Sequence, residues 1–180
     1  MSQDWVVRIE NEGDYDAIDR VIVAASGEPE TAEIVRNLRD DGDALVSLVA
    51  EGAPGVLGHI MMSRILIEGS IDNVAAVALA PLMVAPSSQN RGIGSLLTRD
   101  ALQWCRDDGE NIVLVLGHPT YYRRFGFSSE FAERLETPFE LAVQGAFMGL
   151  ELNPGTQTDI SGRVKYPRAF VLPVEWTIPR

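Results

Sequence analysis

The sequence offers little that would support a disulfide, a nucleic-acid interface or a membrane span. Cys105 is the only cysteine among 180 residues, which excludes an internal disulfide. Only 15 residues are Lys or Arg against 26 Asp and Glu, and nucleic-acid binding relies on clustered positive charge. The longest apolar stretch, Val74 to Pro86, is shorter than the ~20 residues of a membrane helix. We therefore expect no disulfide, no nucleic-acid partner and no membrane segment.

Length and composition predict one globular domain over residues 1–180. Hydrophobic residues make up 46% and charged residues 23% of the chain, which is ordinary for a soluble domain and argues against disorder. The stretch from Met1 to Trp5 lacks the basic region and apolar run of a signal peptide, so a cytoplasmic protein is expected. Cys105 lies on an apolar helix stripe, which favours a buried, inert thiol over a nucleophile.

The negative charge is concentrated in the first third of the chain. Residues 1–60 hold 13 acidic and 4 basic side chains, within a formal net charge of −11 for the whole sequence. Such a field can attract a cationic acceptor, and it can equally be an ordinary solvated surface. The sequence leaves both interpretations open.

A glycine-marked turn joins an apolar strand to an amphipathic helix. The turn is Gln89-Asn90-Arg91-Gly92-Ile93-Gly94, and apolar side chains then recur at three- and four-residue steps until Gly109 ends the helix. Unpaired N–H groups at a helix N-terminus carry about half a positive charge, and glycine lets an anion approach the backbone. The pattern predicts a phosphate site, although two glycines at a turn can also be turn chemistry alone.

Two other phosphate-binding motifs can be excluded. The dinucleotide fingerprint G-x-G-x-x-G would need glycine at the position of Leu97. The P-loop would need Gly-Lys-Ser/Thr after its glycines, and no such sequence follows Gly94. The turn therefore matches neither of these two motifs.

Two motifs in order resemble the GNAT family of N-acetyltransferases. Gln89, Gly92 and Gly94 match the family's pyrophosphate loop, Q/R-x-x-G-x-G/A. After a strand at 111–117, the sequence His118-Pro-Thr-Tyr-Tyr-Arg-Arg-Phe-Gly-Phe127 is similar to the family's Tyr-x-x-x-Gly-Phe ending, with Tyr122 in the tyrosine position. The segment from His118 to Phe127 is also similar to the corresponding sequence in a bacterial subgroup of predicted acetyltransferases with few assigned substrates.

The resemblance implies an α/β (α+β) fold, a mixed and mostly antiparallel sheet flanked by helices. Residues 5–130 form the motif-bearing core, and we expect residues 131–180 to complete the sheet and cover the acceptor pocket. Strands are predicted at 5–9, 45–50, 56–67, 74–84, 111–117, 146–152 and 169–174, and helices at 14–25, 29–38 and 93–108.

The resemblance also implies acetyl-CoA as cosubstrate and assigns residues to it. The strand before the loop should contact the pantetheine arm through its backbone and carry a bulge that directs an amide at the thioester. The expected cofactor-binding residues are Leu82, Met83, Val84, Gln89, Asn90, Arg91, Gly92, Ile93, Gly94 and Ser95. No metal centre is expected.

Tyr122 is the candidate general acid for the departing thiolate. A phenol with a reference pKa of about 10 stays protonated at neutral pH. Tyr121 is adjacent and is the alternative, although the motif spacing favours Tyr122. A core aromatic beside Phe125 and Phe127 is the structural alternative for the same position.

The general base is not identified by the sequence. The strand at 74–84 lacks the glutamate that some relatives carry, and Val115 stands where many relatives have asparagine. His59 could be a base or a structural histidine, and His118 could be a base or a helix-start residue. An ordered chain of water could also remove the proton.

Three functions remain for this sequence. The first is acetyl transfer from acetyl-CoA directly to a primary amine of an unidentified small-molecule or peptide acceptor. The second is a non-catalytic acetyl-CoA-binding regulator or sensor, motivated by the missing strand carboxylate and by Val115. The third, acetylation of aminoacyl-tRNA, is disfavoured by the low basic content. A homodimer through the apolar tail is compatible with the sequence.

Overall fold

The computed structural model describes residues 4–69, 73–141, 143–153, 155 and 160–171. Its helices are α1 (Tyr15–Ser26), α2 (Pro29–Asp40), α3 (Ile93–Asp107), α4 (Pro119–Tyr122) and α5 (Ser129–Ala132). Its 3-10 turns are η1 (Glu12–Asp14), η2 (Pro86–Ser88), η3 (Arg123–Phe125) and η4 (Arg168–Val171). Its strands are β1 (Trp5–Ile9), β2 (Ala44–Gly52), β3 (Gly55–Glu68), β4 (Asn73–Val84), β5 (Ile112–Leu116), β6 (Leu135–Glu136), β7 (Phe147–Glu151) and β8 (Gly162–Lys165).

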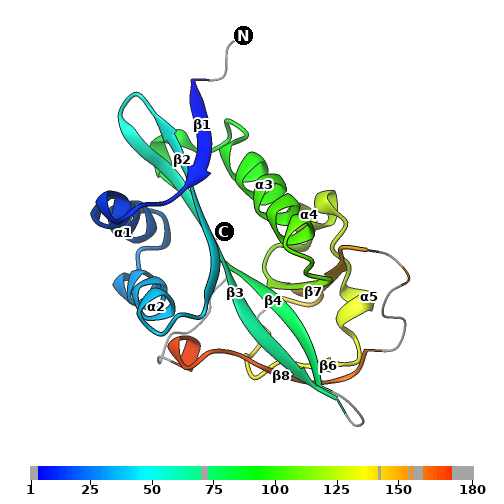
Figure 1. The fold of residues 1–180 in the computed structure, drawn as a ribbon. Coiled ribbons are helices and arrows are strands. Elements are labelled where there is room, and N and C mark those ends of the chain that lie inside the picture. Colours follow the sequence, from blue (N-terminus) through cyan, green and yellow to red (C-terminus); the bar gives the residue numbers. More distant parts are fainter. Residues whose placement is uncertain (1–3, 70–72, 142, 154, 156–159, 172–180) are drawn as a thin grey trace.

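The strands form one mixed sheet with helices on both faces (Figure 1). The main order is β1-β2-β3-β4-β5-β7, in which only the β4–β5 pair is parallel. The far end of β3 pairs antiparallel with β8, and β8 pairs in parallel with β6. This confirms the predicted mixed, mostly antiparallel α+β architecture.

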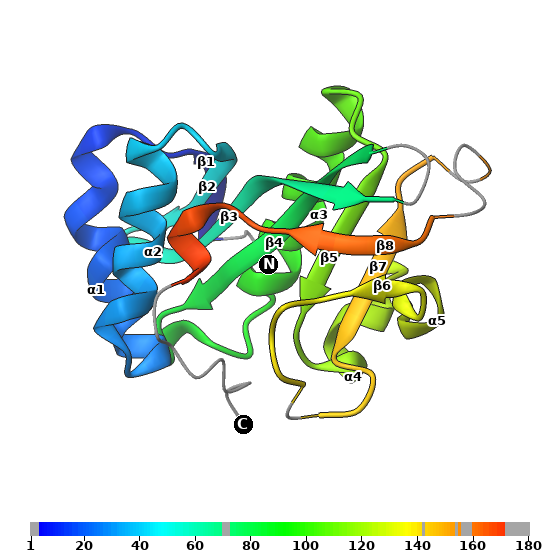
Figure 2. The same cartoon turned by 90° about the horizontal axis from the view of Figure 1, so that it is seen from below.

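Helices α1 and α2 cover one face of the sheet and α3 covers the other (Figures 1 and 2). The apolar sides of α1 and α2 pack on Val49 and Met61 of the sheet, and η4 lies beside α2. On the opposite face α3 buries the stripe that the sequence predicts, including Leu97, Ala101 and Cys105. Burial raises the pKa of Cys105 to about 12, so its thiol stays protonated and unreactive.

The end of the chain departs from the sequence prediction. The strand predicted at 146–152 is present as β7, whereas residues 169–171 of the predicted strand 169–174 lie in η4, and 172–174 lie outside the described residues. Pro167 begins a turn in which its carbonyl accepts the Phe170 N–H at 3.1 Å, and that bond closes a 3-10 turn instead of a ladder. The strand that joins the sheet in this region is β8.

A local separation of two strands determines where the chain can hold a ligand. The parallel pairing of β4 and β5 consists of Val77 opposite Val113 and Ala78 opposite Leu114. Beyond Ala78, β4 continues to Val84 along β3 alone, and its register with β3 shifts between the Ile60–Leu82 and Met62–Leu79 pairs. The β5-facing backbone edge of this segment is therefore without a strand partner in the described chain, next to a bulge.

Candidate functional site

The loop after β4 ends in a helix N-terminus that no side chain caps. Gly92 is the N-cap of α3, with φ of 88°, a left-handed conformation that a side chain would strain. A Cβ atom at this position would meet nothing within 4 Å, so the backbone faces open space. The Leu96 N–H donates to the Gly92 carbonyl at 3.0 Å. The N–H groups of the helix residues between Gly92 and Leu96 have no intrahelical partner.

Side chains of the same loop hold its shape. Gln89 donates through Nε2 to the Val84 carbonyl at 3.1 Å, which ties the loop to the end of β4. Asn90 takes a φ of 60°, and the guanidinium of Arg91 lies 4.8 Å from the ring centre of Trp5 on β1. The Gln89 amide thus has a structural bond here, while the backbone around Gly92 faces open space at an uncapped helix N-terminus.

A pocket of about 300 Å³ lies where β4 and β5 separate. Apolar side chains of β4 and the end of β5 form its walls, and polar groups stand on two sides. The lining residues are Ser26, Glu28, Thr31, Leu79, Ala80, Pro81, Leu82, Met83, Leu116, Gly117, His118, Tyr121 and Tyr122.

Tyr122 is buried at this pocket, with 8% of its surface exposed. Its ring lies directly on Gly117, where a Cβ atom would collide with it, and it contacts Phe127 edge to face. Burial and the neighbouring Tyr121 raise the pKa of Tyr122 well above its usual range. The phenol therefore keeps its proton at neutral pH and can act as a donor.

Three polar residues, Ser26, Glu28 and Thr31, line the pocket on the α1–α2 side. Glu28 is the N-cap of α2, but its side chain makes no capping bond. Its backbone is fixed, because Glu28 N–H donates to Ser26 Oγ at 3.0 Å and its carbonyl accepts Thr31 N–H at 3.2 Å. Within the described chain no cation pairs with the Glu28 carboxylate, and Glu28 is one of the residues that line the pocket.

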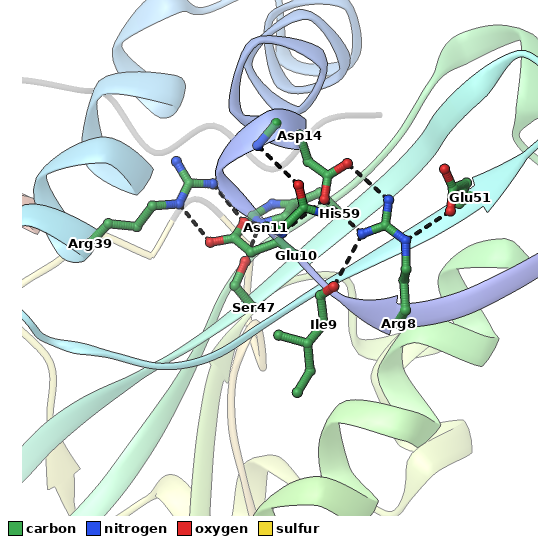
Figure 3. A network of polar contacts seen from close by, with 10 residues as sticks. Arg8, Ile9, Glu10, Asn11, Asp14, Arg39, Ser47, Glu51 and His59 are labelled. Atoms are coloured by element: carbon green, nitrogen blue, oxygen red, sulfur yellow. Dashed lines mark hydrogen bonds and ion pairs between the residues drawn. The ribbon is translucent and has the colours of Figure 1, made fainter.

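His59 lies in a buried polar network rather than among the pocket-lining residues (Figure 3). Its Nε2 is 2.7 Å from Ser47 Oγ and 3.5 Å from Glu10 Oε2. Glu10 in turn accepts two bonds from Arg39 of α2, at 2.7 and 2.8 Å. The network links β1, β2 and β3 to α2, so it supports the helix pair that carries Glu28.

Two charges in this network have shifted pKa values. Despite the opposing effect of burial, hydrogen bonds from His59, Arg39 and Ser47 lower the pKa of Glu10 to about 2. Burial lowers the pKa of His59 below its usual 6.5, against the attraction of Glu10. The folded protein therefore favours neutral His59 and ionised Glu10.

His118 is the N-cap of α4, and its carbonyl accepts Tyr122 N–H at 3.1 Å. It also lines the pocket. Among the residues described, no cluster of three side chains suits a metal ion, and no helix has the length and apolarity needed to cross a membrane.

The structure brings Leu82, Met83 and Tyr122 together in one pocket and sets the Gly92–Gly94 helix start against it. Val84 contacts the same corner, because its side chain lies 3.6 Å from a Cβ placed on Gly94. Sequence reasoning missed Glu28 as an individual residue. The signal for it was an acidic residue immediately before Pro29, at the start of a helix.

Comparison with known proteins identifies the class to which this geometry belongs. Residues 43–129 match the model of the acetyltransferase (GNAT) domain. The uncharacterized N-acetyltransferase YjhQ of Escherichia coli is 36% identical over 125 residues, 68% of this chain and 69% of YjhQ. This chain therefore belongs to the GNAT family of N-acetyltransferases.

Two solved structures share the fold over nearly the whole chain. The GNAT family N-acetyltransferase YhbS from Escherichia coli, in complex with CoA, has a TM-score of 0.86 at 26% identity, covering 94% of this chain and 93% of that one. A GNAT family acetyltransferase from Brucella melitensis, in complex with acetyl-CoA, has a TM-score of 0.75 at 33% identity, covering 92% and 97%.

The buried histidine predicts a specific pH dependence of stability. Below pH 6.5 the unfolded chain binds a proton at His59 that the folded protein resists, so the free energy of unfolding should fall as the pH drops from 6.5 to 5, by up to about 1.4 kcal/mol per pH unit. The Glu10 contribution is lost separately, between about pH 5 and pH 2.

Urea unfolding of the wild type and of His59→Gln between pH 7 and pH 5 measures this effect. The variant should lose less stability over that interval. Equal slopes for the two proteins would show that His59 is not the group responsible.

Proposed function

We propose that the protein transfers an acetyl group from acetyl-CoA directly to a primary amine of an acceptor that enters beside Glu28. The observation that carries this proposal is the pocket between the separated ends of β4 and β5, placed against the uncapped start of α3. Membership of the GNAT family and two relatives with CoA or acetyl-CoA support the same conclusion.

The residues present suit the cofactor. The backbone N–H groups from Arg91 to Ser95, which include those of the first turn of α3, would hold the pyrophosphate. The backbone of Leu82, Met83 and Val84 would bind the pantetheine arm, because the β5-facing edge of this segment has no strand partner in the described chain. Acetyl-CoA would supply an activated acetyl thioester to this pocket.

Chain groups would stabilise charge on both sides of the reaction. A backbone N–H near the β4 bulge would donate to the thioester oxygen as negative charge develops there. The ammonium group of the acceptor would first release a proton to solvent, because only the free amine can attack the acetyl carbon. As the new carbon–nitrogen bond forms and the carbon–sulfur bond breaks, the phenol of Tyr122 would give its proton to the leaving thiolate. The second proton lost by the amine nitrogen would pass to solvent, and solvent would return a proton to Tyr122. The products of the reaction would be the amide of the acceptor and the free thiol of CoA.

Glu28 supports a cationic amine as acceptor. A primary amine is largely an ammonium ion at neutral pH. Glu28 lines the pocket, and its carboxylate has no cationic partner in the described chain. The apolar walls of Leu79, Pro81 and Leu116 suit a slender aliphatic or aromatic body. The comparisons do not favour the alternative of a non-catalytic acetyl-CoA sensor.

The phosphate loop can be tested with two glycines at opposite ends of α3. Gly92→Trp should abolish acetyl-CoA binding in calorimetric titration, because the indole would occupy the open space in front of the helix N-terminus. Gly109→Trp is the matched control: Gly109 has a φ of 85°, also faces open space and carries similar backbone strain. Wild-type affinity in Gly92→Trp would contradict the loop assignment, and a wild type without binding would contradict the proposed cofactor.

Tyr122→Phe tests the proton donor. The substitution keeps the ring against Gly117 and Phe127 but removes the acidic hydrogen, so we expect turnover to fall by about 10²-fold with little change in acetyl-CoA affinity. Thiol release with a panel of primary alkyl and aryl amines measures turnover, and calorimetry measures affinity. Full turnover in the variant would assign the proton to another group.

Glu28→Gln tests the acceptor side. Loss of the carboxylate should raise KM for a cationic amine by about tenfold while leaving the Kd for acetyl-CoA unchanged. Glu30→Gln removes an equal charge from the first turn of the same helix, outside the pocket lining, and should change KM less than twofold. If the two variants behaved alike, general charge attraction rather than a contact at Glu28 would explain acceptor binding.

A further inference from the structure

The hydroxyl group of Tyr121 is buried and has no hydrogen-bond partner in the described chain. A buried hydroxyl without a partner is costly and uncommon in native proteins. Three neighbours contact the Tyr121 ring. The centre of this ring lies 5.0 Å from the ring centre of Tyr122 and 5.3 Å from that of Phe125, and the Arg124 guanidinium lies 4.5 Å from it. The position of the oxygen is thus imposed by packing on three sides.

The Tyr121 oxygen lies at the junction of the loop, β4 and the pocket. A Cβ atom on Gly94 would be 2.9 Å from it, 3.6 Å from the Val84 side chain and 3.9 Å from the Leu82 side chain. The ring itself lines the pocket. The absence of a side chain at Gly94 is therefore needed for Tyr121 to reach this corner, in addition to any role in phosphate binding.

We infer that the Tyr121 hydroxyl donates a hydrogen bond to an oxygen atom of acetyl-CoA where the cofactor passes from the start of α3 into the pocket. The inference rests on the proposed function. The hydroxyl is the donor, and its partner is an oxygen of the pyrophosphate or of the adjoining pantetheine arm, since both would pass this corner. No group of the described chain bonds to the hydroxyl, and an oxygen of the bound cofactor would supply its partner.

This role differs from that of Tyr122 in what each hydroxyl is expected to control. The Tyr121 hydroxyl would raise affinity for the cofactor at the expense of the stability of the free protein. Removing it should therefore change the two quantities in opposite directions. A tyrosine that served only to fill the core would not produce that combination.

Calorimetry and thermal unfolding of Tyr121→Phe test the inference. We expect acetyl-CoA to bind about tenfold more weakly, and Tm of the free protein to rise by about 2–4 °C because a buried unsatisfied group is removed. Tyr15→Phe is the matched control, since Tyr15 is 37% exposed and lies outside the pocket lining. It should change neither quantity.

Two further experiments locate the partner of the Tyr121 hydroxyl. S-acetylpantetheine lacks the pyrophosphate, so a comparable loss with this fragment places the partner on the pantetheine arm, and a loss confined to acetyl-CoA places it on the pyrophosphate. Gly94→Ala should weaken acetyl-CoA binding less in the Tyr121→Phe background than in the wild type, because the added methyl group would no longer meet the oxygen.

Wild-type affinity in Tyr121→Phe would overturn the inference while leaving the proposed function intact. A wild type that does not bind acetyl-CoA would overturn both. Weaker binding of acetyl-CoA to Tyr121→Phe together with a lowered Tm would show that the hydroxyl stabilises the free fold, and would also overturn the inference.

Discussion

The short parallel pairing between β4 and β5 is the constraint on which the rest of the site depends. Two paired positions, Val77 with Val113 and Ala78 with Leu114, hold the strands together at one end. A longer ladder would occupy the backbone edge of β4 and close the pocket. Because β3 supports the other edge of β4 as far as Val84, the strand stays ordered while one side of its backbone remains available.

The two faces of the sheet have separate tasks at this opening. Helix α3 packs on one face and presents its N-terminus to the loop, while α1 and α2 pack on the other and bring Glu28 to the pocket. The bidentate contact between Arg39 and Glu10 joins α2 to the end of β1 in a nearly buried setting. Such pairs are costly to desolvate, and removing one partner leaves an uncompensated charge, so the contact favours one docking position for the helix pair.

The sequence allowed prediction of the elements whose signals are local. The apolar stripe from Ile93 to Cys105 predicted α3, and the strand segments 56–67 and 74–84 predicted β3 and β4 within a few residues. The family resemblance correctly implied the mixed sheet. Local patterns could not predict how far β4 and β5 pair, because pairing depends on side chains of several elements. The same limit explains why β8 was missed: four residues that pair with β3 and β6 have little periodicity of their own.

The site residues also divide into those with a local sequence signal and those whose positions depend on packing. The place of Gly92 at the start of a helix could be predicted from the sequence, and its positive φ agrees with that place. The corner shared by Gly94, Val84 and Tyr121 arises from the packing of α4 against the loop, which no sequence spacing reveals. Glu28 was visible only as one of many acids in an acidic first third, and it differs from them because it lies among the residues that line the pocket.

The buried state of Cys105 has a practical consequence for assays. It is the only thiol in the chain, and burial holds it in its unreactive protonated form. A colorimetric disulfide reagent added to the native protein should consequently report thiols released from a thioester without a protein background. The same reagent added under denaturing conditions should count one thiol per chain, which provides an internal standard for protein concentration.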